Sequence, residues 1–108
     1  MTRTVDVVIV GARPAARGAA IEAARRGLRV LVVTRSRRAR FAGRLRRSVR
    51  AAGEGARRQL TILTGAEVVC VDGIRSVEAV VIRRIRTGRL IGVNASAILV
   101  FNSSDSSV

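Results

Sequence analysis

The residues best suited to chemistry in this chain form a turn near its start, where an apolar run gives way to small residues. Gly11 follows the apolar run at once, and five further residues lead into the small-residue segment: Ala12, Arg13, Pro14, Ala15 and Ala16. A strand, a glycine turn and a helix in this order bring helix amides and the positive end of the helix dipole onto a phosphate group. The pattern predicts a turn that binds the pyrophosphate of a dinucleotide.

The glycine pattern of this turn is incomplete. Dinucleotide sites of this kind follow G-x-G-x-x-G/A, and here Gly11 is the first glycine, Arg13 stands at the second position and Ala16 at the third. A side chain at the second position obstructs the approach of backbone to pyrophosphate, although the guanidinium of Arg13 has the chemistry to bind a phosphate directly. The pattern therefore predicts the fold more strongly than it predicts binding.

A second group of candidate residues follows the next apolar run, residues 28–33. Its members are polar or basic and close in sequence: Thr34, Arg35, Arg37, Arg38 and Arg40. Sites for FAD and NAD normally carry an acidic residue at the end of the second strand, whereas NADP sites place arginine nearby for the 2′-phosphate. The arginines favour NADP, with FAD as the alternative. A solvated charged loop without a ligand is the other interpretation.

No residue set in the chain predicts catalysis or metal binding. There is no histidine, and Cys70 is the single cysteine. Histidine acid–base chemistry, a disulfide framework, a redox cysteine pair and a cysteine metal site are therefore excluded for this sequence. Cys70 lies in an apolar, alternating segment, so we expect a small core residue rather than a nucleophile.

The charge balance is strongly basic. The chain has 21 basic residues, all arginine, against 7 acidic ones, for a formal net charge of +14. This charge predicts nonspecific attraction to polyanions that weakens as salt rises. Phe41 and Phe101 are the only aromatic residues, too few for the stacking surfaces of a typical nucleic-acid module. A hydrophobic content of 48% argues against disorder, and no apolar run reaches the roughly 20 residues of a membrane helix, so we expect a soluble cytoplasmic protein.

The periodicity of the chain places these residues on a definite set of elements. We expect parallel strands at residues 5–10, 28–33 and 60–63, a helix at 15–26, and an amphipathic helix from residue 41 to 56 that Gly53 and Gly55 weaken. Residues 67–71, 77–85 and 89–93 predict an antiparallel meander, and 97–101 a final strand. The sequence thus predicts an α/β, Rossmann-like three-layer domain over residues 1–101, with a parallel sheet, a three-stranded antiparallel β-meander and a polar tail at 102–108.

This order of elements resembles one nucleotide-binding domain of the thioredoxin-reductase-like pyridine nucleotide oxidoreductases. Residues 6–15 are similar to the FAD-binding segment of that family. Residues 61–69, 77–80 and 87–88 are similar to its NADPH-binding domain, which often carries alanine at the third position of the glycine pattern. The arginines after Thr34 also resemble the arginine-rich loop of the NADPH domains.

The resemblance implies a role but not a complete enzyme. In this family a hydride passes between nicotinamide and a flavin held by a second domain, and the reductases add a cysteine pair that this chain lacks. We therefore expect an FAD/NAD(P)-binding module of a shortened or split oxidoreductase, working with a second flavoprotein subunit or as a homo-oligomer. The alternative is a non-catalytic basic module, either a degenerate nucleotide-binding fold or an electrostatic binder of nucleic acid or acidic partners.

Overall fold

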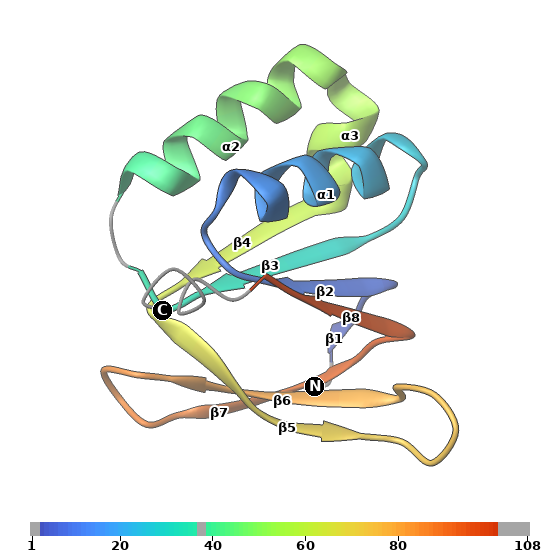
Figure 1. Cartoon of the computed structure of the whole chain (residues 1–108), viewed down its shortest axis with the longest axis vertical. Coiled ribbons are helices and arrows are strands. Elements are labelled where there is room, and N and C mark those ends of the chain that lie inside the picture. Colours follow the sequence, from blue (N-terminus) through green and yellow to red (C-terminus); the bar gives the residue numbers. More distant parts are fainter. Residues whose placement is uncertain (1–2, 37–38, 102–108) are drawn as a thin grey trace.

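The computed structural model describes residues 3–36 and 39–101, which form three layers of secondary structure (Figure 1). A parallel sheet is the middle layer, with helices over one face and a second sheet under the other. This architecture confirms the α/β, Rossmann-like prediction of a parallel sheet combined with an antiparallel meander. Residues 102–108, the predicted polar tail, lie outside the described residues.

The parallel sheet has four strands, which in spatial order are β4 (Leu60–Thr64), β3 (Val30–Thr34), β2 (Val7–Val10) and β8 (Ala97–Val100). All neighbouring strands in it run parallel, which was predicted for β2, β3 and β4 and was left open for β8. Successive side chains of a strand point to opposite faces, so Val7 and Ile9 face the helices while Val8 faces the second sheet. Because both faces are covered, the central strands are apolar except for the buried Thr34 at the end of β3.

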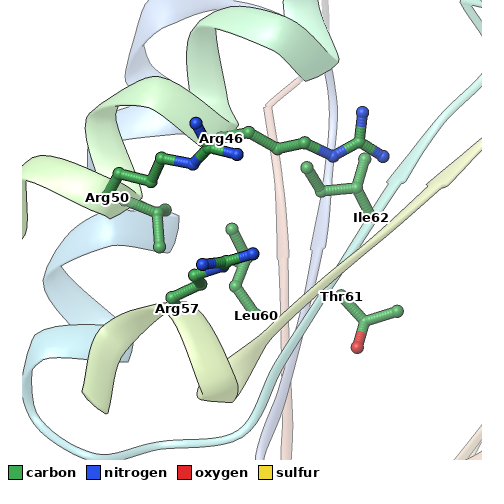
Figure 2. Close-up of a pocket in the computed structure, with 7 residues that line it drawn as sticks. Arg46, Arg50, Arg57, Leu60, Thr61 and Ile62 are labelled. Atoms are coloured by element: carbon green, nitrogen blue, oxygen red, sulfur yellow. The ribbon is translucent and has the colours of Figure 1, made fainter. Parts of the chain in front are cut away.

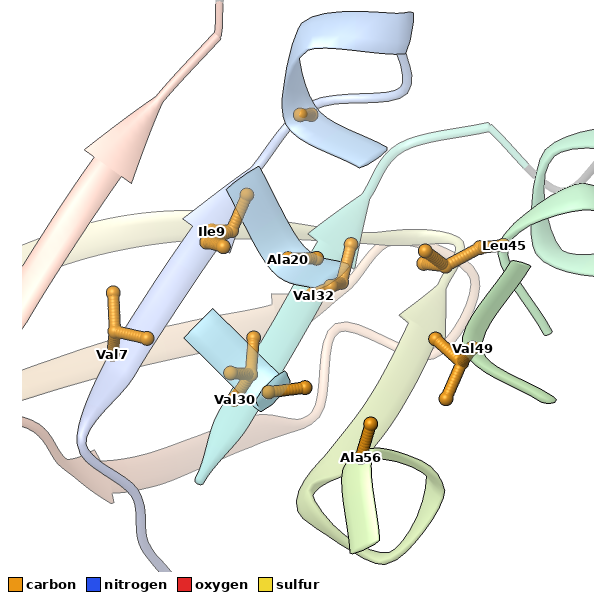
Figure 3. Close-up of a cluster of buried hydrophobic side chains, with 10 residues drawn as sticks. Val7, Ile9, Ala20, Val30, Val32, Leu45, Val49 and Ala56 are labelled. Carbon is orange, nitrogen blue, oxygen red and sulfur yellow. The ribbon is translucent and has the colours of Figure 1, made fainter. Parts of the chain in front are cut away.

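Helix α1 (Pro14–Arg25) packs on the sheet through small side chains. Ala16, Ala20 and Ala24 recur every four residues, and all three are buried in the core between the helices and the sheet. Figure 3 labels Ala20 in this core. Alanine on this face lets the helix lie close to the strands. The helix begins at Pro14, and proline is tolerated there because an N–H at the first helical position would have no acceptor within the helix. The helix ends before Gly27, which adopts a φ of +84°.

The amphipathic segment forms two helices instead of the one that was predicted. Helix α2 (Ala39–Ala52) ends before Gly53, and the short helix α3 (Glu54–Gln59) follows directly. Gly53 has a φ of +113°, outside the helical range, which breaks the helix and turns the chain toward β4. Leu45 and Val49 of α2 and Ala56 of α3 are buried against the sheet (Figure 3).

The second sheet contains, in spatial order, β1 (Arg3–Thr4), β7 (Leu90–Asn94), β6 (Ala79–Arg84) and β5 (Ala66–Asp72). Strands β5, β6 and β7 are the predicted antiparallel meander. Strand β1 was not predicted, and it pairs parallel with β7. The single strand expected at residues 5–10 was therefore wrong at its start, because the chain passes from one sheet to the other at Val5, whose N–H donates to the carbonyl of Asn94 at 2.8 Å.

The two sheets share a second core. Val8, Leu31 and Val33 of the parallel sheet pack against Val80 and Ile82 of the meander, and all five side chains are buried. This core holds the meander against the face of the parallel sheet that the helices leave uncovered.

Candidate functional site

The candidate site lies at the carboxyl ends of β2, β3 and β8. The chain leaves β2 at Gly11, whose N–H donates to the carbonyl of Val33 at 3.0 Å and so ties the turn to β3. A cavity of about 200 Å³ opens here, and segments from all three strand ends line it: Val10, Gly11, Ala12, Val33, Thr34, Arg35, Ser36, Val100 and Phe101. The structure thus brings the glycine turn and the Thr34–Arg35 pair together around one cavity.

Phe101 is one part of this site that sequence reasoning missed. Its N–H donates to the carbonyl of Val10 at 2.7 Å, which places the end of β8 directly over the turn. Gly11 has a φ of +140°, and a Cβ at this position would lie 2.5 Å from the carbonyl oxygen of Phe101. Gly11 is therefore required by the close approach of another strand as well as by the turn itself. The pattern of residues 97–101 predicted a strand but gave no sign of its position beside Gly11.

The N-terminal end of α1 follows the Gly11 turn closely in the chain. Arg13 is the N-cap residue, with extended backbone, and it makes no side-chain cap hydrogen bond to the helix. The first-turn amides of Ala15 and Ala16 have no helical acceptor, because the first turn of any helix leaves such groups open. Ala16, at the third position of the glycine pattern, is completely buried against the sheet, where a small side chain is needed.

The end of β3 is shaped by Thr34. This side chain is only 2% exposed, and its Oγ1 accepts a hydrogen bond from the N–H of Ser36 at 3.2 Å. The hydroxyl therefore holds the turn that follows the strand. Arg35 projects into solvent beside it, with 76% of its side chain exposed. Of the other predicted arginines, Arg40 belongs to the first turn of α2, whereas Arg37 and Arg38 lie outside the described residues.

An acidic residue that the sequence analysis did not single out reaches this site from the meander. Glu67 on β5 lies with its Oε1 3.9 Å from the Nε of Arg35, and its Oε2 accepts a hydrogen bond from the Nε of Arg83 at 3.1 Å. This hydrogen bond, together with the positive charges of Arg83 and Arg35, lowers the pKa of Glu67. The carboxylate thus lies between two arginines and stays ionised. The signal that could have found part of this cluster is the register of the meander, in which Glu67 stands opposite Arg83.

Cys70 does not have the position that was predicted for it. It is exposed on β5 rather than buried in a core. The register of β5 against β6 shifts between Val68 and Cys70, and from Val69 onward the strand is exposed whichever way its side chains point. The alternating pattern therefore predicted the burial of Cys70 wrongly, because nothing in the described structure covers this end of the strand.

The described part of the chain offers neither a metal cluster nor a membrane helix. No group of three or more histidine, cysteine, aspartate or glutamate side chains is placed to hold a metal ion within residues 3–36 and 39–101. None of the helices in these residues is both long and apolar enough to cross a membrane.

Comparison with known proteins gives a fold but no sequence relative. No protein-family model and no curated protein matches the sequence. Among solved structures, thioredoxin reductase from Giardia duodenalis matches with a TM-score of 0.70 at 19% identity, over 93% of this chain and 31% of that one. Thioredoxin reductase from Streptococcus pyogenes matches with a TM-score of 0.68 at 18% identity, over 94% of this chain and 32% of that one.

A myxobacterial FAD-dependent halogenase has a similar fold, with a TM-score of 0.66 at 14% identity over 91% of this chain and 37% of that one. The chain spans about one third of the length of the thioredoxin reductases that it matches. It therefore has the fold of the Rossmann-like, nucleotide-binding domain of thioredoxin reductases and related flavoprotein oxidoreductases.

Proposed function

We propose that this chain is a dinucleotide-binding module of a flavin-dependent, pyridine-nucleotide-linked oxidoreductase, with NADP as its ligand and FAD as the second choice. The observation that carries the proposal is the cavity in which the Gly11 turn, the end of β3 and Arg35 meet. In folds of this kind, dinucleotides lie outside the carboxyl ends of the strands, with the pyrophosphate at the first helix.

Each part of the ligand has a counterpart in the site. The amide of the exposed residue Ala15 and the positive end of α1 would receive the pyrophosphate, with the guanidinium of Arg13 beside them. Ligand pockets usually measure about 300 to 1,000 Å³, so the cavity of about 200 Å³ takes one part of a dinucleotide, the adenosine ribose and its phosphate. The remainder would lie along the turn.

The groups at the end of β3 favour the phosphorylated nucleotide. FAD and NAD need an acceptor there for the ribose hydroxyls, but Thr34 uses its hydroxyl to hold the backbone of Ser36. Glu67 is engaged by Arg83 and Arg35. Arg35 is exposed and can turn toward a 2′-phosphate, for which a charge-assisted hydrogen bond is a strong contact.

Hydride transfer would need a second cofactor-binding unit, because the proposed site holds one dinucleotide. The thioredoxin reductases of the same fold are about three times as long as this chain. We therefore propose that this module works together with a flavoprotein subunit or with a second copy of itself. Mixing it with candidate flavoproteins and following NADPH oxidation by its absorbance would measure that step.

The binding proposal is tested by calorimetric titration with NADPH, NADH and FAD at near-physiological salt. We expect NADPH to bind most tightly, and Arg35→Ala to weaken it by about tenfold or more, the usual effect of losing a hydrogen bond to a charged group. NADH affinity should change little. Arg29→Ala is the matched control. Like Arg35, Arg29 is an exposed arginine next to β3 that pairs with a carboxylate, here Asp6 at 3.7 Å, but it lies at the other end of the strand.

Two results would overturn the proposal. Absence of binding by all three dinucleotides would leave the fold without its expected ligand. Equal losses in the Arg35 and Arg29 variants would mean that affinity follows net charge alone.

The second candidate function is electrostatic binding of a polyanion, and the observation that favours it is the net charge of +14. Such binding would fall steeply and smoothly with salt and would not distinguish NADPH from other polyanions of similar charge. A salt series of the same titrations separates the two functions, because a specific site keeps its preference for NADPH over NADH as salt rises.

A further inference from the structure

A second cavity lies on the helical face of the molecule, away from the candidate dinucleotide site. It has a volume of about 340 Å³ and lies between α2, α3 and the start of β4 (Figure 2). Its lining combines basic and apolar residues: Arg46, Val49, Arg50, Arg57, Leu60, Thr61 and Ile62.

This cavity belongs to the opposite end of the parallel sheet from the glycine turn. Leu60 stands beside Val30 at the start of β3, whereas Thr64 stands beside Thr34 at its end. Four residues of extended chain span about 13 Å, so the two sites are separated along the strands as well as across the sheet. None of the residues that line the dinucleotide cavity lines this one.

Three guanidinium groups gather around the cavity. Arg46 and Arg50 lie one turn apart on the same side of α2, and Arg57 comes from α3 (Figure 2). Arg57 pairs with Glu54 at 3.5 Å, but both side chains are more than half exposed, and exposed ion pairs contribute little to stability. Within residues 3–36 and 39–101, no carboxylate pairs with Arg46 or Arg50. A bound anion would offset the mutual repulsion of these charges.

The floor of the cavity is apolar. Leu60 and Ile62 point toward the helices and pack against the buried core that contains Val49. Thr61, between them, stands beside Leu31, whose side chain belongs to the core on the opposite face of the parallel sheet. Figure 2 shows the side chain of Thr61 directed away from the arginines. Its hydroxyl is therefore not part of the binding surface, and the cavity offers cations above and aliphatic side chains below.

We propose that this cavity binds a small organic anion, whose phosphate or carboxylate group is held by Arg46, Arg50 and Arg57 and whose apolar body rests on Leu60 and Ile62. Guanidinium groups bind oxyanions through paired, charge-assisted hydrogen bonds. The volume lies within the usual range for small-molecule sites, which is about 300 to 1,000 Å³. The site is independent of the proposed dinucleotide function.

The test is calorimetric titration with phenyl phosphate, benzoate and inorganic phosphate at about 0.15 M salt, where charge effects are screened beyond about 8 Å. We expect phenyl phosphate to bind about tenfold more tightly than inorganic phosphate, because its ring covers apolar surface. Benzoate shows whether the site prefers phosphate or carboxylate, and binding of either ring compound supports the proposal. No binding of either at millimolar concentration overturns it.

A charge-matched pair of variants locates the binding. Arg46→Gln/Arg50→Gln should weaken phenyl phosphate at least about tenfold. Arg44→Gln/Arg47→Gln removes the same charge from the same helix, at residues that do not line the cavity, and should leave affinity within about twofold. Equal losses in the two variants would overturn the proposal in favour of nonspecific charge attraction. Thermal unfolding without ligand verifies that both variants fold.

Two further readouts separate this site from the dinucleotide site. Arg35→Ala should bind phenyl phosphate as the unaltered protein does, even if the dinucleotide proposal fails. In ¹H–¹⁵N spectra, phenyl phosphate should shift the amides of α2, α3 and the start of β4. Shifts confined to the Gly11 turn would overturn the assignment of the anion to this cavity.

Discussion

The contact between Gly11 and the end of β8 makes a quantitative prediction about stability. In Gly11→Ala, the new Cβ would lie 2.5 Å from the carbonyl oxygen of Phe101 and 3.1 Å from its Cβ. The φ of +140° is also a conformation that alanine rarely adopts. Both effects act on the turn at the candidate site.

The magnitude has two parts. Holding a residue other than glycine in such a conformation costs about 1 to 3 kcal/mol. Relief of the close contact requires Phe101 to move, and this weakens the 2.7 Å hydrogen bond from its N–H to Val10, which contributes about 1 kcal/mol. We therefore expect a loss of about 2 to 4 kcal/mol in the free energy of unfolding, or roughly 10 to 25 °C in Tm for a domain of this size.

Two other glycines separate these contributions. Gly27 has a φ of +84°, and a Cβ added to it would meet no atom within 4 Å, so Gly27→Ala measures the conformational cost without a clash. Gly18 lies inside α1 with open space around it, so Gly18→Ala should stabilise the protein by about 0.5 to 1 kcal/mol. The expected order of Tm, from highest to lowest, is therefore Gly18→Ala, unaltered protein, Gly27→Ala and Gly11→Ala.

Thermal and urea unfolding followed by circular dichroism measure these differences. A Tm for Gly11→Ala within a few degrees of the unaltered protein would refute the close approach of β8 to the turn. A Tm equal to that of Gly27→Ala would refute the clash while leaving the conformational argument intact.

Two further predictions concern the core and the ion pairs of the meander. Leu45→Ala should destabilise the protein by about 2 to 5 kcal/mol in urea unfolding, because Leu45 is completely buried between α2 and the sheet, whereas Leu90→Ala, at a side chain that is 62% exposed, should change stability by less than about 1 kcal/mol. Equal effects would contradict the packing of α2. The pKa of Glu67 is lower in the folded protein than in the unfolded chain, so its contribution to stability is present above the ordinary glutamate pKa of about 4.3 and is lost as pH falls through the lower folded value. The Tm difference between the unaltered protein and Glu67→Gln should therefore shrink below about pH 4, and a difference that stays constant with pH would contradict the pairing with Arg83.

The sequence by itself determined the first βαβ unit, the third parallel strand and the meander. The apolar runs, the glycine turn at Gly11 and the alanines of α1 act over short stretches of chain, and each pattern agrees with its neighbours. Ala16 is completely buried against the sheet, and its part in a cofactor-binding turn stays a prediction. The pattern of residues 41–56 did not predict that the helix breaks at Gly53. This break depends on the φ angle of Gly53, which the two glycines Gly53 and Gly55 permit but do not require.

Tertiary structure decided the features that depend on contacts between distant segments. The pairing of β1 with β7, the position of Phe101 at Gly11 and the approach of Glu67 to Arg35 join residues more than 30 positions apart. Alternating hydrophobicity says which face a side chain takes but not whether another layer covers that face, which is why Cys70 is exposed. Strand register and layer packing are set by the whole chain at once, so the sequence predicted the ends of β2 and β3 but not the segments that pack beside them.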